Sequence, residues 1–304
     1  MIMTDRTKNY GRSVRSRLTN LMNESGYKYM YLLARYFNER LLYRVSVSQY
    51  KDNFLLKGGS LIYAINGLDS RPTIDIDFMA DRISRDRAFL EDVFREILSI
   101  ECQEDGVTFD TSSLRTEAIT VEKKYPGTRF HVTAHMDSIV YPMSMDIGFG
   151  DVVTPCPASV DYPLLLKDIP SVHIQAYSLE TVIAEKFHAM IDRDVLNSRM
   201  KDFFDCHQIL LTRNLDTETL YEAIKATFDN RQLVFKPDLQ LFESSFATDE
   251  MRIKMWKSFL KKIQWKEDLD FTQVMDLIRE HLQPLYIKYW KEKSDKYRLN
   301  TPRP

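Results

Sequence analysis

The sequence predicts an α+β protein, in which a mixed α/β core at about residues 45–160 is preceded and followed by helices. Short apolar or alternating segments, which are typical of strands, concentrate between residues 54 and 149. Beyond Pro170 the apolar residues recur at helical spacing instead. We therefore expect three regions, an N-terminal helical segment (1–45), a core domain (46–165) and a helical C-terminal domain (166–304).

The periodicity of apolar residues also gives the expected elements in order. Ser60 is expected to cap a short helix that Gly67 ends, and a turn at Pro126-Gly127 is expected between two strands. The expected helices are 27–47, 60–66, 84–99, 179–191, 201–211, 217–228, 251–263 and 272–290, and the expected strands are 54–56, 73–79, 114–121, 129–135 and 143–149.

The composition excludes several classes of protein. Of 304 residues, 44% are hydrophobic and 28% charged, which excludes a disordered chain. The net charge of −2 excludes a globally basic nucleic-acid binder. Cys102, Cys156 and Cys206 form no CxxC pair, which favours a reducing cytoplasm over a disulfide framework. The polar N-terminus resembles no signal peptide and apolar runs are short, so we expect no membrane partner.

An alternating segment at residues 73–79 contains two carboxylates. Residues i and i+2 of a strand share a face, so Asp75 and Asp77 are expected to project together with Cα atoms about 6.6–7 Å apart. Ile74, Ile76 and Phe78 are expected to pack behind them. Two like charges so close need a compensating cation, and Mg²⁺ prefers carboxylate and phosphate oxygens. The alternative is an edge strand with a solvated acidic face.

A second segment, residues 143–149, places Ser144, Asp146 and Gly148 on one face of a strand. If the two acidic strands are neighbours, three carboxylates converge, which is enough for a site with two metal ions. If they are not neighbours, Asp146 is a lone carboxylate at the end of a strand.

The turn Lys57-Gly58-Gly59-Ser60 lies between a predicted strand and a predicted helix. Glycines allow close approach of a ligand, and the N–H groups of a helix N-terminus bind phosphate. The alternative is an ordinary turn followed by a serine cap. The sequence contains no P-loop and no G-x-G-x-x-G motif.

Lys186 lies within an apolar helical stripe, where a lysine must reach solvent, a carboxylate or a ligand. Asp202 and Asp205 share a face of the following helix, so an ion pair could join the two helices. That structural role and a contact with phosphate are both compatible with the spacing. Basic residues also gather near the N-terminus, where they could bind RNA or simply face solvent: Arg6, Lys8, Arg12, Arg15 and Arg17.

The order of these motifs resembles that of the AbiEii-type nucleotidyltransferase family, which includes toxins of bacterial toxin–antitoxin and phage-defence systems. The resemblance spans about residues 12–212 and fades beyond. The motifs that carry the resemblance lie at residues 35–36, 39–44, 54–60, 71–77, 146–151, 180–187 and 198–205.

The resemblance implies a fold and a reaction. It implies a DNA polymerase β-like nucleotidyltransferase core at 46–165, and a cytoplasmic enzyme that transfers a nucleotide from a nucleoside triphosphate to RNA, with the 3′ end of tRNA as the expected acceptor. Two Mg²⁺ ions are expected, with Mn²⁺ as a substitute. The expected protein partner is a cognate antitoxin, of which winged-helix regulators are a common kind.

The resemblance also implies roles for individual residues. Gly59 and Ser60 would hold the nucleotide phosphates, and Asp75 and Asp77 would bind Mg²⁺. Asp146 would act as a metal ligand or base. Lys186 would contact the triphosphate, and Asp202 would hold or orient Lys186. Two other functions remain open, namely nucleotidylation or phosphorylation of a protein acceptor, and a non-catalytic module that binds nucleotide or antitoxin.

Overall fold

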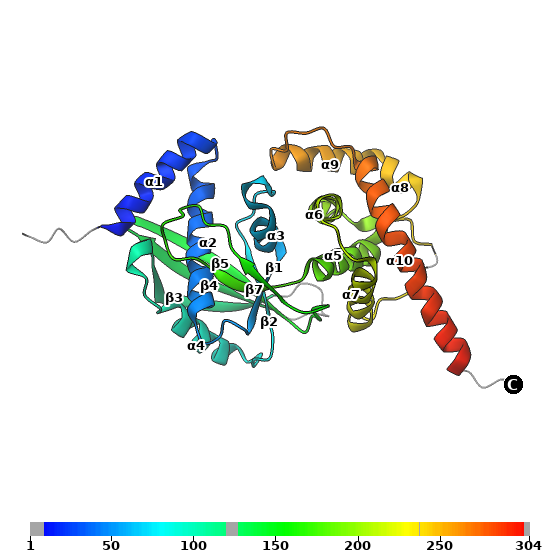
Figure 1. Cartoon of the computed structure of the whole chain (residues 1–304), viewed down its shortest axis with the longest axis horizontal. Coiled ribbons are helices and arrows are strands. Elements are labelled where there is room, and N and C mark those ends of the chain that lie inside the picture. Colours follow the sequence, from blue (N-terminus) through cyan, green and yellow to red (C-terminus); the bar gives the residue numbers. More distant parts are fainter. Residues whose placement is uncertain (1–8, 120–126, 237, 301–304) are drawn as a thin grey trace, which may run out of the picture. The chain divides into compact units, whose positions relative to one another are not determined.

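A computed structural model describes residues 9–119, 127–236 and 238–300 (Figure 1). The chain divides into two compact units. The first comprises Met1–Gly150 and Ala158–Ala176, and the second comprises Asp151–Pro157 and Tyr177–Pro304. The strands of the described residues all belong to the first unit, and the described part of the second unit is mainly helical.

A mixed sheet forms the centre of the first unit. Its strands are β1 (Phe54–Lys57), β2 (Ile76–Ala80), β3 (Thr108–Ile119), β4 (Gly127–Met136), β5 (Ile139–Phe149), β6 (Ala158–Asp161) and β7 (His173–Ala176). They lie in the order β3-β4-β5-β2-β1-β7-β6. The β2–β5 and β1–β7 pairs are parallel and the other pairs are antiparallel. The sheet therefore brings β2 and β5, which are far apart in the sequence, side by side.

Helices α2 and α4 cover one face of the β4–β5 part of this sheet (Figure 1). Phe94 of α4 packs against Phe130 of β4 with ring centroids 4.7 Å apart, and Phe37 of α2 stacks on Tyr141 of β5 at 4.9 Å. Every second residue of β4 is buried, so the residues between them, such as Arg129, lie on the opposite face. The helices and 3₁₀ turns of this unit are α1 (Tyr10–Ser25), α2 (Tyr29–Val47), α3 (Gly58–Asn66), η1 (Gly67–Asp69), α4 (Arg87–Leu98) and η2 (Gln103–Asp105).

The second unit consists of packed helices. Its elements are α5 (Leu179–Arg193), η3 (Asp194–Leu196), α6 (Met200–Thr212), α7 (Thr217–Asn230), α8 (Ser244–Thr248), α9 (Glu250–Lys262) and α10 (Phe271–Asn300). Helix α5 packs against α6 and α7, and α10 packs against α6. Phe187, Phe228 and Tyr289 form part of an aromatic core, with successive ring centroids 5.6 and 5.2 Å apart. Among the described helices, none is both long and apolar enough to cross a membrane.

The predicted fold class is confirmed, since a mixed sheet with flanking helices is followed by a mainly helical region. The expected strands are all present, although β3 begins at Thr108 and residues 120–121 of its predicted end lie outside the described residues, as does Pro126 of the predicted turn. The short strands β6 and β7 were not predicted, because four residues give too little alternation to detect.

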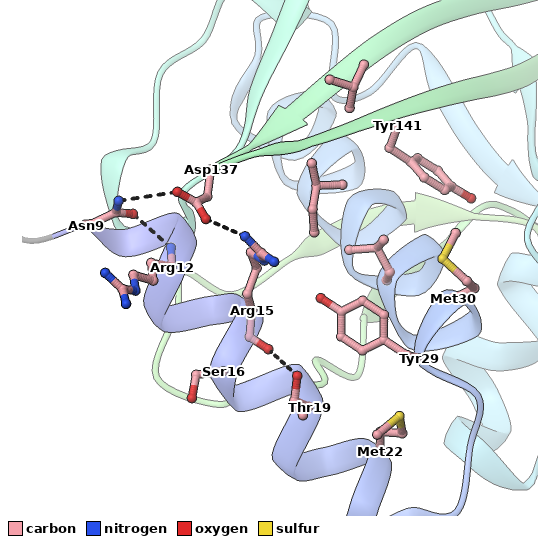
Figure 2. A pocket seen from close by; sticks show the side chains of 13 residues that line it. Asn9, Arg12, Arg15, Ser16, Thr19, Met22, Tyr29, Met30, Asp137 and Tyr141 are labelled. Atoms are coloured by element: carbon pink, nitrogen blue, oxygen red, sulfur yellow. Dashed lines mark hydrogen bonds and ion pairs between the residues drawn. The ribbon is translucent and has the colours of Figure 1, made fainter.

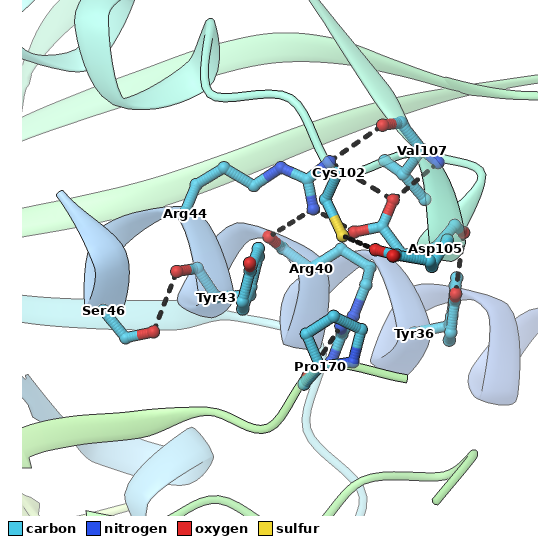
Figure 3. A network of polar contacts seen from close by, with 10 residues as sticks. Tyr36, Arg40, Tyr43, Arg44, Ser46, Cys102, Asp105, Val107 and Pro170 are labelled. Carbon is cyan, nitrogen blue, oxygen red and sulfur yellow. Dashed lines mark hydrogen bonds and ion pairs between the residues drawn. The ribbon is translucent and has the colours of Figure 1, made fainter. Parts of the chain in front are cut away.

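Helix α2 carries buried charged side chains that hold two loops, at Val107 and at Leu165, against the core. Arg44 forms an ion pair with Asp105 and also donates to the Val107 carbonyl at 2.9 Å (Figure 3). The carboxylate of Asp105 accepts from the Val107 amide as well, at 2.9 Å. Both members of the pair are at most 1% exposed. The buried pair therefore fixes the connection between α4 and β3.

Glu39 lies on the same helix and is fully buried. Its two carboxylate oxygens each accept from the Leu165 amide at 3.2 Å. Burial raises the pKa of Glu39, the neighbouring Arg40 and Arg35 oppose that rise, and the result is a pKa of about 7. The folded protein therefore binds a proton at Glu39 more readily than the unfolded chain does.

We expect Asp105→Asn to lower the free energy of unfolding by about 3 kcal/mol, because the change leaves the Arg44 charge buried without its partner. Urea denaturation of the full chain measures the effect. The matched control is Glu104→Gln, since Glu104 is the exposed neighbour and should change stability by less than about 0.5 kcal/mol. A loss in Asp105→Asn as small as the one expected for the control would show that the buried pair is dispensable.

We expect Glu39 to make stability depend on pH. Because its folded pKa of about 7 lies above the 4.5 of an ordinary glutamate, its contribution to stability is present below pH 4.5 and is lost as pH rises through 7. The loss amounts to about 2–3 kcal/mol at neutral pH. Glu39→Gln should remove this dependence in denaturation curves recorded between pH 5 and 8, whereas Glu24→Gln, on the surface, should not. Parallel curves for wild type and Glu39→Gln would contradict the assignment.

Candidate active site

The turn after β1 is tied directly to the acidic segment. Helix α3 begins at Gly58, two residues before Ser60, so the prediction that Ser60 caps this helix is wrong. The Ser60 side chain is buried, and its hydroxyl donates to the Asp75 carbonyl at 2.8 Å. The hydroxyl therefore holds the start of α3 against the chain that enters β2.

Neighbouring side chains lie so close to the two glycines of this turn that any larger residue would collide with them. Gly58 has φ +66°, and a Cβ atom there would lie 2.1 Å from Oδ2 of Asp77. A Cβ atom at Gly59 would lie 2.5 Å from Oγ1 of Thr73. The Asp77 carboxylate therefore lies directly against the backbone of the turn, where no other residue leaves room for it.

Asp77 and Asp146 lie side by side on neighbouring parallel strands. They are register partners in the β2–β5 ladder, and adjacent strands lie about 4.8 Å apart. Both side chains are partly exposed. The two acidic strands are therefore neighbours, which is the condition for these carboxylates to converge.

Asp75 differs from expectation because β2 begins only at Ile76. Asp75 is exposed and precedes the strand, and Ile74 is 55% exposed instead of packing behind the acidic face. Ile76 and Phe78 are buried as expected. Asp75 still belongs to the same electrostatic environment, since its charge helps to raise the pKa of Arg129.

Arg129 of β4 is a site residue that the sequence analysis missed. Its Nε donates to Oδ1 of Asp146 at 2.7 Å, and its NH2 group donates to Oδ2 at 2.8 Å. These hydrogen bonds, and the charge of Asp146, raise the pKa of the Arg129 guanidinium. Alternation within β4 places Arg129 on this face, but only the strand register reveals its partner.

The donor set suits a hard divalent cation that also binds phosphate. Asp75, Asp77 and Asp146 supply the carboxylate oxygens that Mg²⁺ and Mn²⁺ prefer. In the described part of the chain, no group of three His, Cys, Asp or Glu side chains is already arranged to hold a metal ion. Mg²⁺ is commonly held by one or two carboxylates together with substrate phosphates, so a pair such as Asp77 and Asp146 is sufficient on chemical grounds.

Lys186 and Asp202 belong to the second unit and form an ion-pair network there. The Lys186 ammonium donates to Asp202 at 2.9 Å and to Asp205 at 2.7 Å, and Arg199 also pairs with Asp202. Burial alone would raise the pKa of Asp202, but Lys186 and Arg199 lower it to about 2. The ion pair between helices that the spacing allowed is present and joins α5 to α6.

The basic group near the N-terminus borders a separate hollow of about 1020 Å³ on the first unit (Figure 2). Arg12 and Arg15 line it with Tyr29 and Tyr141, and Arg15 pairs with Asp137 at 2.6 Å. None of the predicted site residues lines this hollow. Arg6 and Lys8 lie outside the described residues.

Two solved structures from Helicobacter pylori resemble the chain: a protein assigned as a nucleotidyltransferase, with 13% identity and a TM-score of 0.48, and JHP933, with 15% identity and a TM-score of 0.42. The alignments cover 87% and 88% of this chain and 98% of each of the others. Among curated proteins, no sequence matches the chain.

A family model identifies the family to which the chain belongs. The model of the nucleotidyl transferase AbiEii toxin of type IV toxin–antitoxin systems matches residues 40–281, which is most of the chain and contains every predicted site residue. The protein therefore belongs to the AbiEii nucleotidyltransferase toxin family.

Proposed function

We propose that this nucleotidyltransferase uses Mg²⁺ to transfer a nucleotide from a nucleoside triphosphate to RNA, with the 3′ end of tRNA as acceptor. The observation that supports the proposal best is the register pairing of Asp77 with Asp146 beside the Gly58–Gly59 turn. This places paired carboxylates next to the N–H groups of a helix start, which suits a metal-bound triphosphate. Two Mg²⁺ ions, or Mn²⁺ in their place, are the proposed cofactors.

Each part of the site has a proposed task. The backbone at Gly59 and the Ser60 segment would hold the triphosphate, and Asp75, Asp77 and Asp146 would hold the metal. The bound metal would neutralise the phosphates and favour ionisation of the acceptor hydroxyl. That hydroxyl oxygen bonds to the α-phosphorus as the bond to pyrophosphate breaks, and the hydroxyl proton passes to Asp146 or to water.

The proposed role of Lys186 is to contact the triphosphate, with Asp202 as the residue that orients it. The 2.9 Å hydrogen bond between Lys186 and Asp202 supports the orienting role. The lowered pKa of Asp202 keeps that carboxylate ionised, so it favours the charged ammonium of Lys186. The phosphate contact itself rests on the family.

Membership in a toxin–antitoxin family implies a cognate antitoxin as partner. We propose a winged-helix regulator in this role and a cytoplasmic location for both proteins. Binding of such a regulator to the purified toxin, and a growth defect that its co-expression relieves, would support this assignment.

The proposed reaction is tested by incubating the purified chain with each radiolabelled nucleoside triphosphate, Mg²⁺ and total tRNA. We expect label on tRNA with wild type and at least about a hundredfold less with Asp77→Asn, since removal of one charge-stabilising group commonly costs that much. The control Asp81→Asn removes a carboxylate just beyond the end of β2, where Asp81 pairs with Arg82 on the surface, and should retain activity.

The position of the label separates the alternatives. Label on a protein band instead of RNA would replace the proposed acceptor with a protein side chain. No label on either, with an active control enzyme present, would favour a non-catalytic module. Equal activity of Asp77→Asn and wild type would remove Asp77 from the site.

We expect Gly58→Ala to abolish most transfer activity, because its Cβ atom would displace the Asp77 carboxylate. The control is Gly26→Ala, since Gly26 has a similar φ of +74° but no atom within 4 Å of the added methyl group. Both variants share the backbone strain of an alanine at positive φ, about 1 kcal/mol or somewhat more. A transfer assay at 25 °C, with folding checked by circular dichroism, should therefore separate them. Similar activity in both variants would contradict the close contact.

A further inference from the structure

A row of charged residues crosses the sheet through the candidate site. Its members are successive register partners on five neighbouring strands: Lys57, Asp77, Asp146, Arg129 and Glu117. Register partners on one row project to the same face of a sheet. The two adjacent carboxylates therefore have a cationic residue on each side of them.

The Arg129 end of this row is bound directly to a predicted metal ligand. The guanidinium donates to both oxygens of Asp146, at 2.7 and 2.8 Å, in the two-pronged geometry that guanidinium and carboxylate favour. Glu117 and Asp75 add to the negative field around Arg129. The guanidinium therefore supplies the positive charge that the adjacent carboxylates need.

A divalent cation at this pair would require oxygen lone pairs that Arg129 now uses. Guanidinium and metal ion carry the same sign of charge, so they compete for Asp146 electrostatically as well as sterically. The pair is accessible for exchange, since the side chains of Arg129 and Asp146 are 42% and 28% exposed. An arginine side chain is long enough to swing away while its backbone stays in β4.

We propose that Arg129 is a positioning residue that holds Asp146 until a divalent cation replaces it. This inference rests on the proposed function, because it assigns Asp146 to the metal. A free cation must displace the guanidinium unaided, whereas a cation that arrives with a nucleoside triphosphate also gains the phosphate contacts. Arg129 thereby lowers the affinity for metal alone and links metal binding to nucleotide binding.

The test is a titration of the full-length protein with Mn²⁺ in the absence of nucleotide, in which electron paramagnetic resonance measures free Mn²⁺. We expect Arg129→Gln to bind Mn²⁺ about tenfold more tightly than wild type, since one neighbouring charge shifts carboxylate equilibria by about that much. The Mn²⁺ affinity of Arg129→Lys should lie between those of wild type and Arg129→Gln, because lysine keeps the positive charge but cannot donate two hydrogen bonds to Asp146 in the geometry of a guanidinium.

The matched control is Arg115→Gln. Arg115 lies two residues from Glu117 on β3, in the next row of the same face, where its register partner is His131. This variant removes the same charge without touching Asp146, so its Mn²⁺ affinity should stay within about twofold of wild type. The double variant Arg129→Gln/Asp146→Asn should lose the gain, which would locate the effect at Asp146.

Unchanged or weaker Mn²⁺ binding by Arg129→Gln overturns the proposal, as does an equal gain in Arg115→Gln. Thermal melting of each variant checks that the sheet is intact, and Arg129→Lys provides the comparison if Arg129→Gln is unstable. Failure of the proposed function looks different, since wild type would then transfer no label to RNA whatever its affinity for Mn²⁺.

Discussion

The parallel pairing of β2 with β5 is the constraint on which the candidate site depends. It places Asp77 and Asp146 next to each other although 68 residues separate them in sequence. A slip of one residue in this register would turn one carboxylate toward the opposite face, where α2 and α4 pack. The two faces of β5 differ chemically, since Met145 and Ile147 on one face are buried. Their burial fixes the register of β5 and therefore also the position of Asp146 on the other face.

The repulsion between these carboxylates also explains the surrounding sequence. Gly58 has no side chain where the Asp77 carboxylate lies, and Arg129 supplies positive charge to Asp146. Ser60 fastens the same turn to the backbone at Asp75. Gly58, Ser60 and Arg129 therefore all help to hold two negatively charged side chains next to each other on one face of the sheet.

The sequence could predict the local features but not the pairings between distant segments. Alternation identified the faces of Asp77 and Asp146, because the period of a strand is a local property. It could not show that these two residues are register partners or that Arg129 lies opposite Asp146, since register depends on contacts between distant segments. The start of α3 was missed for a related reason: Ser60 is a good cap by type, yet its hydroxyl bonds to the Asp75 carbonyl instead. The spacing of Lys186 and Asp202 did allow an ion pair, because neighbouring helices bring such residues together locally.

Both units neutralise a carboxylate with a cationic side chain, but the surroundings of the two pairs differ in a way that bears on function. In the second unit, the side chains of Lys186 and Asp202 are only 13% and 2% exposed, so little water could solvate the two charges if they parted. In the first unit, Arg129 and Asp146 are 42% and 28% exposed, so water can solvate both groups when they part. A buried pair is suited to hold a side chain in one orientation, whereas a partly exposed pair can exchange its cation at modest cost. Solvent access therefore supports the proposed role of Asp202 in orienting Lys186 and the proposed exchange of cations at Asp146.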